Sequence, residues 1–268
     1  RQRQMCIRDR AIEAHEELLS NGKSYHVAIQ SPTVTTATCT YPDFISKYKK
    51  GISGMTGTSN IDEFNEIYNL PTYEVPSRVP NIRVDLNNSV YLTKNAKYKA
   101  IVDDVLKAHE TLQPVLIGTT SVEESVIISK MLEDAGIRHQ LLNAVNNENE
   151  AGIIENAGMK GRVTVATNMA GRGSNIRLGK GVKEIGGLYV IGTSRNNNER
   201  IDNQLRGRAS RQGEPGKTKY YSSLEDDLVR TRGSEELLDA VSKLSKNKDA
   251  EITDKNIIDN LSKQFANK

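Results

Sequence analysis

Cysteine and aromatic residues are scarce in this sequence of 268 residues, which has two cysteines, no tryptophan and aromatic side chains at only 5% of positions. The two cysteines, Cys6 and Cys39, form neither a disulfide framework nor the spacing of a metal site. This usage favours a reducing, cytoplasmic compartment, and we expect no metal ligands within the chain. No apolar run reaches the roughly 18 residues that a membrane-spanning helix needs, and no secretory leader is visible.

Charge of one sign is also lacking, because 37 lysines and arginines stand against 34 aspartates and glutamates, for a net charge of +3. Bulk electrostatics therefore gives no argument for nucleic acid as a partner. The chain is polar, with 36% hydrophobic residues and a mean hydropathy of −0.57, yet it is long enough for one large or two small domains with proper cores.

Two elements of a self-sufficient nucleotide hydrolase are missing from the sequence. No stretch matches the phosphate-binding pattern G-x-x-x-x-G-K-[ST], and no predicted strand ends in the paired acids that would hold Mg²⁺ and orient water. A chain that lacks both can form only one side of a nucleotide cleft.

Short apolar runs alternate with helical patterns from Ala96 onward, which predicts an α/β fold with a parallel sheet covered by helices on both faces. The predicted strands are Pro114–Gly118, His139–Leu142, Val163–Thr167, Leu188–Ile191 and Thr218–Tyr221. The predicted helices are Lys97–His109, a helix capped by Ser121, Glu148–Asn156 and Asn198–Arg208. Leu106 is expected on the inner face of the first helix. Val126, Ile127, Met131 and Leu132 are expected on the inner face of the second.

The earlier part of the chain is less regular. Thr33–Tyr41 is rich in β-forming residues, and helical patterns follow Pro42 and cover Asp62–Tyr68. The first ten residues, RQRQMCIRDR, resemble translated adapter sequence, so we treat residues 1–10 as a non-native leader. Three prolines place a domain boundary near Pro80, and the polar, amphipathic stretch from 231 to 268 is expected to begin a helical region that stops within an element.

A glycine–arginine loop, Ala170–Gly173, directly follows a strand pattern. Ligands of open α/β sheets bind off the carboxyl ends of strands, and glycine lets the backbone come close to them. Gly171, Arg172 and Gly173, with Asn175 just beyond, are therefore candidates for binding a nucleotide. The alternative is a tight turn with a solvated arginine.

A second segment, Gln204–Gly213, carries the pattern Gln-x-x-Gly-Arg-x-x-Arg. Arg208 and Arg211 place two fork-shaped donors at one helix end, a geometry suited to reaching a γ-phosphate from outside the phosphate loop. The helix dipole would favour arginines there in any case. A nucleic-acid patch is a further alternative, although no aromatic residues for base stacking are interleaved. The two loops together favour the nucleotide interpretation.

Other polar segments have simpler readings. The turn Ser53–Thr58 is either a helix cap or a loop that couples two lobes, with Thr56 and Gly57 at its tip. The pair Glu123–Glu124 is explained by capping, and the run Glu225–Asp227 by a match to a helix dipole.

Several of these segments resemble the SecA family, the preprotein translocase motor ATPases of bacteria. The resemblance covers roughly residues 11–240 and is carried by SGMTGT, IYNLPTYEVPSRVPNIRVD, QPVLIGTTSVEES, LLNA, EAGIIENAG, ATNMAGRGSNIRLG, GGLYVIGT, RIDNQLRGRASRQGEPG and SLEDDLVR. It implies a P-loop NTPase with two RecA-like lobes around ATP. The chain would hold the end of the first lobe and the linker (11–80), the second, helicase-like lobe (81–230) and the start of a helical scaffold (231–268).

The resemblance also implies roles for single residues. Arg208 and Arg211 match the finger arginines, Gln204 leads their segment, Arg172 senses nucleotide, and Asn175 occupies a nucleotide-contacting position. ATP and Mg²⁺ are the implied cofactors, with the Mg²⁺ ligands outside this chain, which is expected to be inactive alone.

The implied function is ATP-driven export of unfolded preproteins through a SecY-type membrane channel. The implied partners further include an anionic membrane surface and a second copy in a homodimer, with no specific nucleic acid. The parent protein would be cytoplasmic and peripheral on the inner face of the cell membrane.

Three departures from the family pattern suggest an accessory SecA paralogue. Gly-Ser-Asn-Ile stands for the usual Gly-Thr-Asp-Ile at 173–176, Gly-Arg-Ala-Ser-Arg for Gly-Arg-Ser-Gly-Arg at 207–211, and Ser-Arg-Asn-Asn for Glu-Arg-His-Glu at 194–197. Losing the glycine at Ser210 is expected to stiffen or shift Arg211. Two rival functions stay open: a nucleic-acid helicase lobe, and a non-enzymatic regulatory lobe.

Overall fold

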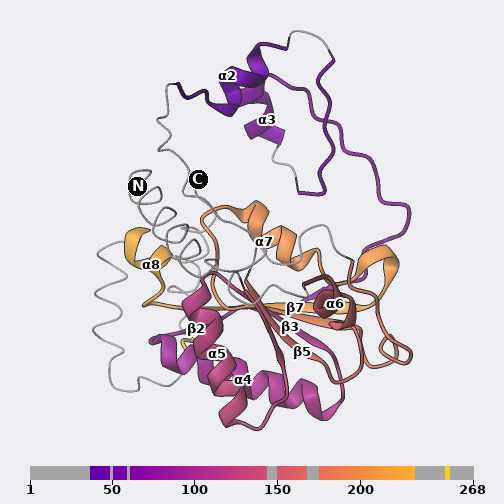
Figure 1. Cartoon of the computed structure of the whole chain (residues 1–268), viewed down its shortest axis with the longest axis vertical. Helices are drawn as coiled ribbons and strands as arrows, with labels where there is room; N and C mark the ends of the chain where they lie inside the picture. Colours follow the sequence, from indigo (N-terminus) through magenta and orange to yellow (C-terminus); the bar gives the residue numbers. More distant parts are fainter. Residues whose placement is uncertain are drawn as a thin grey trace, which may run out of the picture. The chain divides into compact units, whose positions relative to one another are not determined.

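The computed structural model describes residues 37–48, 51–58, 61–143, 150–167, 175–232 and 251–253 (Figure 1). The expected leader, the helical pattern after it, and the loop residues Gly171, Arg172 and Gly173 lie outside these ranges. The described residues divide into two compact units, 37–54 with 65–70, and 55–64 with those from Pro71 onward.

The first unit contains α2 (Tyr41–Ser46). The β-rich pattern predicted a strand up to Tyr41, and within the described residues this is wrong, because 37–40 form no strand and Tyr41 begins α2. Thr40 keeps an extended backbone since it is the N-cap, and its Oγ1 accepts the N–H of Asp43 at 3.2 Å. The helix α3 (Ile61–Tyr68) follows its predicted range to within a residue.

The second unit is built on a sheet of seven strands in the order β1-β7-β6-β3-β5-β4, with β2 also paired to β7. Every pairing between these strands is parallel, as predicted. The strands are β1 (Val84–Asp85), β2 (Ser89–Tyr91), β3 (Val115–Thr119), β4 (Gln140–Leu142), β5 (Val163–Thr167), β6 (Leu188–Gly192) and β7 (Gly216–Ser223).

Helices cover both faces of this sheet. Figure 1 shows α4 (Lys94–Glu110) and α5 (Val122–Asp134) on one face, and α6 (Glu150–Asn156) and α7 (Glu199–Arg206) on the other. Side chains alternate along each strand, so Val115 and Ile117 join the core under α4 and α5 while Leu116 joins the core under α6 and α7. The second of these cores contains Leu205 and so packs α7 against its face of the sheet.

On the two helices α4 and α5, some residues that the sequence predicted to face the core are exposed. Val126 and Ile127 of α5 are 51% and 46% exposed, and Leu106 of α4 is 36% exposed. The buried stripe of α5 instead contains Ser125, Ile128, Ser129 and Leu132. Because a helix turns 100° per residue, this i, i+3, i+4, i+7 stripe leaves the two neighbouring apolar residues on the outside.

The remaining differences lie at element ends. Thr93 caps α4, so the helix begins three residues before the predicted Lys97. The two short strands β1 and β2 were not predicted, since elements this short show no periodicity. The helix α8 (Asp227–Arg232) agrees with the prediction that the acidic run opens a helix, since Asp227 lies in its first turn. Among the described residues no helix has the length and apolarity of a membrane span.

Candidate functional site

The carboxyl ends of the parallel strands share one edge of the sheet, where α/β domains bind ligands. From this edge β6 leads into residues 193–198 and then α7, and β3 leads through Thr120 into α5. Beyond β5 lies the predicted glycine–arginine loop, of which Asn175 is the first described residue. The edge therefore holds the ends of β3, β5 and β6, whereas the second predicted segment, Gln204–Gly213, leads from α7 to the amino end of β7.

Local interactions define α7, the helix that precedes the two predicted finger arginines. Asn198 is its N-cap and accepts the N–H of Arg200 at 2.9 Å. Gly207 ends it, with its N–H bonded to the carbonyl of Asn203 at 2.8 Å. Arg206 lies in the last turn, where the helix dipole favours a cation, and Arg208 follows as a half-buried side chain.

Two of the predicted site residues meet directly. The Nη1 of Arg211 donates to the Oδ1 of Asn175 at 2.8 Å, although the residues are 36 positions apart. The Nε of Arg211 donates to the carbonyl of Gly207 at 3.0 Å. The fold thus brings together the segment after β5 and the segment after α7. They meet on the α6 and α7 side of the sheet, toward the amino ends of the strands, since Ser210 lies against Gly216, the first residue of β7, and Gly179 is bonded to Gly158, which precedes β5.

The backbone at Ser210 explains why a glycine suits this position. Ser210 has φ 57° and ψ 45°, in the left-handed region that costs an L-residue about 1–2 kcal/mol. Its Oγ donates to the carbonyl of Glu214 at 2.6 Å, which offsets part of that cost. Serine therefore keeps the turn in place.

The predicted coupling loop reaches α7 within the second unit. The Nε2 of Gln204 lies 3.4 Å from the Oγ1 of Thr58, and the N–H of Thr58 is bonded to the Oγ1 of Thr56 at 3.2 Å. Gly57, between these two threonines, is exposed. This contact gives the loop a direct route to the arginine segment.

The sequence analysis did not identify the residues that support α7 on its sheet-facing side. Tyr220 of β7 is 1% exposed, and its hydroxyl donates to the carbonyl of Asp202 at 2.9 Å. The carboxylate of Asp202 pairs with Arg195 Nε at 2.8 Å. Burial raises the pKa of Asp202, against the opposing effect of Arg195. No sequence motif marks Tyr220, because its role depends on the pairing of β7 with β6.

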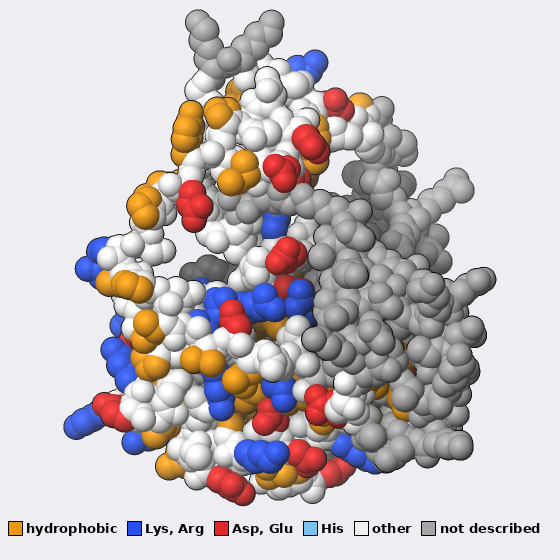
Figure 2. Space-filling view, turned by 180° about the vertical axis from the view of Figure 1, so that it is seen from behind, with side chains coloured by type: hydrophobic (Ala, Val, Ile, Leu, Met, Phe, Trp, Pro, Cys, Tyr) orange, Lys and Arg blue, Asp and Glu red, His pale blue; other side chains and the backbone are white. Residues whose placement is uncertain are grey.

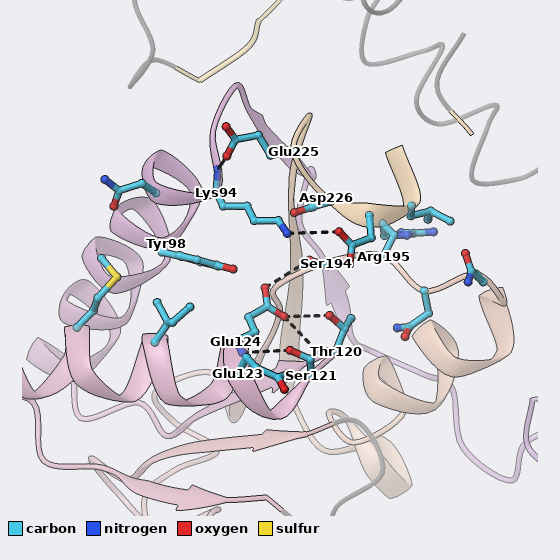
Figure 3. A pocket seen from close by; sticks show the side chains of 17 residues that line it. Lys94, Tyr98, Thr120, Ser121, Glu123, Glu124, Ser194, Arg195, Glu225 and Asp226 are labelled. Atoms are coloured by element: carbon cyan, nitrogen blue, oxygen red, sulfur yellow. Dashed lines mark hydrogen bonds and ion pairs between the residues drawn. The ribbon is translucent and has the colours of Figure 1, made fainter. Parts of the chain in front are cut away.

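A hollow of about 680 Å³ opens at the carboxyl edge of the sheet between α4, α5 and the start of α8 (Figure 3). Figure 3 shows Glu124 bonded to Thr120 and Ser194 on its wall, and Glu225 beside Lys94. The Oγ of Ser121 accepts the N–H of Glu124 at 3.1 Å, so the predicted cap is present.

Beneath this hollow lies a buried ion cluster that the sequence did not reveal. Lys97 is fully buried, and its Nζ lies 2.7 Å from Asp226 Oδ1 and 3.4 Å from Glu124 Oε1. It also donates to Ser194 Oγ at 2.9 Å. Burial acts to raise the pKa of Glu124, but Lys97 and hydrogen bonds from Thr120 hold it below its ordinary value. The carboxylates predicted only to cap helices therefore neutralise a lysine in the core.

Charge on the surface is mixed. Figure 2 shows a band of Lys and Arg side chains across the middle of one face, with Asp and Glu side chains scattered around it. Among the described residues, no group of three or more His, Cys, Asp or Glu side chains could hold a metal ion.

Comparison with known proteins agrees with the motifs. A model of the family described as SecA P-loop domain matches residues 80–183 and 180–249. A protein translocase subunit SecA of Campylobacter concisus is 53% identical over 213 residues, 79% of this chain and 24% of that protein. A protein translocase subunit SecA of Caldicellulosiruptor saccharolyticus is 50% identical over 239 residues, 88% of this chain and 28% of that protein. The chain thus spans about a quarter of the length of these relatives.

Solved structures give weaker likenesses. The E. coli DEAD-box protein SrmB, solved bound to RraA, matches with a TM-score of 0.43 at 18% identity over 57% of this chain and 83% of that chain. The C-terminal part of the Fun30 ATPase domain matches with a TM-score of 0.38 at 16% identity, over 63% of this chain and 52% of that chain. Both scores are low, and we draw nothing further from them.

The all-parallel sheet and the helices on both faces, together with the family match, define an α/β domain of the P-loop NTPase class. The chain belongs to the SecA family of P-loop domains, as its motifs indicated.

Proposed function

We propose that this chain is the second nucleotide-binding lobe of a bacterial preprotein translocase ATPase, and that it closes on ATP held by a first lobe. The observation that carries the proposal is the hydrogen bond between Arg211 and Asn175, because it joins the two candidate nucleotide segments. The SecA relatives at 50% identity or more support the assignment to protein translocation.

The side chains around this contact fit an anionic ligand. The Nε of Arg206 is buried without a hydrogen-bond partner, and Arg208 and Arg211 follow within five residues. Arginine binds phosphate oxygens through two parallel N–H donors. ATP with Mg²⁺, when bound, supplies the phosphoanhydride bond, and in our proposal another part of the parent protein supplies the phosphate loop, the Mg²⁺ ligands and the acid that activates water.

Each residue of the proposed site has a distinct task. Arg208 and Arg211 would stabilise negative charge on the γ-phosphate, an effect worth ~10³–10⁵ in rate for an arginine finger. Asn175 orients Arg211 through a neutral acceptor. Arg172, with Gly171 and Gly173, is proposed to contact the nucleotide from the loop after β5. Gln204 would pass the state of the site to the coupling loop through Thr58.

The wider setting follows from the same assignment. We propose that the parent protein is cytoplasmic, associates with the inner face of the bacterial membrane, and drives unfolded preproteins through a SecY-type channel. An anionic membrane surface and a second copy of the protein are further proposed partners.

The test is ATP hydrolysis by this chain, alone and mixed with a first lobe that carries the phosphate loop, expressed from the Caldicellulosiruptor relative. We expect activity only in the mixture, and a loss of at least ~10³-fold in kcat with Arg211→Ala. Arg162→Ala, an exposed arginine before β5, is the matched control and should leave kcat unchanged. An inactive mixture whose components still associate upon ATP addition would favour the regulatory lobe, and salt-dependent RNA binding would favour the helicase lobe.

A further inference from the structure

The helix α7 is too short to hold its own position. It has eight residues, and isolated helices of fewer than ~12 residues are marginal in water. Arg208 and Arg211 come directly after it, so their placement depends on what fixes α7 against the sheet.

The ring of Tyr220 provides the floor beneath α7. It lies so close to Gly192 of β6 that a Cβ on Gly192 would come within 2.3 Å of the ring. On the other side, the Cζ atoms of Arg195 and Arg206 each lie 5.0 Å from the ring centroid. The ring is thus held between the bare backbone of one strand and two guanidinium groups.

The Tyr220 hydroxyl and the Asp202 carboxylate complete the attachment. The hydroxyl donates to the carbonyl of Asp202 in the first turn of α7 at 2.9 Å. The carboxylate of Asp202 pairs with Arg195 at 2.8 Å and accepts from Asn196 N and Nδ2 at 3.1 and 2.8 Å. One tyrosine therefore contacts the first turn of α7 through its hydroxyl and the last turn through Arg206.

We infer that Tyr220 is a positioning residue that fixes the register of α7 on the sheet and thereby places Arg208 and Arg211 for nucleotide. The inference rests on the proposed function for its effect on hydrolysis. Its structural part, the fixing of α7, stands on the contacts of Tyr220 alone. Tyr220 acts through the arginines and itself touches no reacting atom.

The other face of the sheet offers a matched control. Tyr189 of β6 is also 1% exposed, and its hydroxyl donates to Asp104 Oδ2 at 2.6 Å. Its ring lies in the core under α4 and α5, away from α7. Tyr189→Leu and Tyr220→Leu remove the same side chain from equally buried sites, so they differ mainly in what the ring supports.

The experiment measures kcat and KM for ATP in the two-lobe mixture described above, together with the NMR resonances of the Arg195 and Arg206 Nε–H groups in this chain alone. We expect Tyr220→Leu to lower kcat ~10–100-fold more than Tyr189→Leu, with KM changed less than threefold, because misplaced groups act on the transition state. Tyr220→Phe keeps the ring and should recover most of the activity. The two arginine resonances, shifted by the ring in the wild type, should move only in Tyr220→Leu.

The kcat values and the arginine resonances together test whether Tyr220 fixes α7. Equal losses of kcat in the two leucine variants, or unmoved arginine resonances in a folded Tyr220→Leu chain, would overturn it. A wild-type mixture without hydrolysis would count against the proposed function instead, and the resonances together with hydrogen exchange of the α7 amides would still show whether Tyr220 fixes the helix. If Tyr220→Leu does not fold, hydrogen exchange of the α7 amides decides: faster exchange in Tyr220→Phe, which lacks the bond to the Asp202 carbonyl, than in Tyr189→Phe supports the inference, and equal exchange overturns it.

Discussion

Replacing Lys97 with methionine should destabilise the second unit strongly, because it leaves two carboxylates beneath the hollow without their cation. Lys97 and its partners Glu124 and Asp226 have side chains 0%, 8% and 7% exposed. Removing one member of a buried ion pair typically costs about 3–5 kcal/mol, since the partner charge stays buried. For a domain of this size that corresponds to a fall of roughly 6–20 °C in Tm.

The assay is urea unfolding of the chain followed by circular dichroism at several pH values. The pKa of Glu124 is lowered in the folded protein, so its stabilising effect is fully present above the unfolded pKa, near 4.5, and is lost as the pH falls through the folded value. In Lys97→Met the carboxylate of Glu124 is buried without its cation, so it takes up a proton at a higher pH than in the wild type. The stability difference from the wild type should therefore be largest near pH 7 and shrink progressively as the pH is lowered through the acid range.

Lys94→Met is the control for a lysine on the same helix. Its Nζ lies 3.5 Å from Asp227, but the two side chains are 39% and 91% exposed. A surface pair of this kind contributes about 0–1 kcal/mol. If Lys97→Met costs less than 1 kcal/mol at pH 7, or no more than Lys94→Met, the reasoning about the buried cluster is wrong.

Three further substitutions test the site. Asn175→Asp should strengthen the contact with Arg211 by about 0.2–1 kcal/mol at low salt and lose that gain at high salt. A thermal-shift titration with NaCl measures this, and an unchanged Tm at low salt would contradict the contact. Ser210→Ala should lower the free energy of unfolding by about 1 kcal/mol, because it loses a hydrogen bond and keeps the left-handed backbone. Ser210→Gly should be close to wild type, because glycine adopts that backbone freely. Urea unfolding measures both, and the reverse order of stability would be evidence against the turn. Gly192→Ala should cost about 1–3 kcal/mol and disturb the signals of α7 in NMR, since its methyl group would overlap the ring of Tyr220; a neutral effect would argue against that packing.

Much of the fold could be predicted from the sequence. β5 was predicted at its observed bounds, and β3 and β6 to within a residue, because five-residue apolar runs bounded by turns are typical of buried parallel strands. The cap at Ser121 was also predictable, since capping is a local interaction. The face of α5 was not, because Ser125 and Ser129 are polar residues on the buried side.

The candidate site was predictable only as a set of residue types. The glycines and arginines of the two segments indicated a ligand edge, and the structure brings Asn175 within 2.8 Å of Arg211. Nothing along the sequence connects Lys97 with Glu124 and Asp226, which lie 27 and 129 residues away. The sequence shows a lysine on an otherwise apolar face of α4, but it does not show the partners of that lysine. The partners come from two other elements, which meet α4 only in the folded protein.

The sequence by itself determined the class of this domain and its family, and it supplied the candidate residues for an anion site, because these depend on local periodicity and on motifs at fixed spacing. The tertiary structure alone decided how those residues are held. Gly192 and Tyr220 became one packed unit through the pairing of β6 with β7, and Lys97 became buried through the approach of α5 and the end of β7 to α4. Such contacts depend on which strands become neighbours, and that choice follows from burial of the whole core and leaves no periodic trace in the chain.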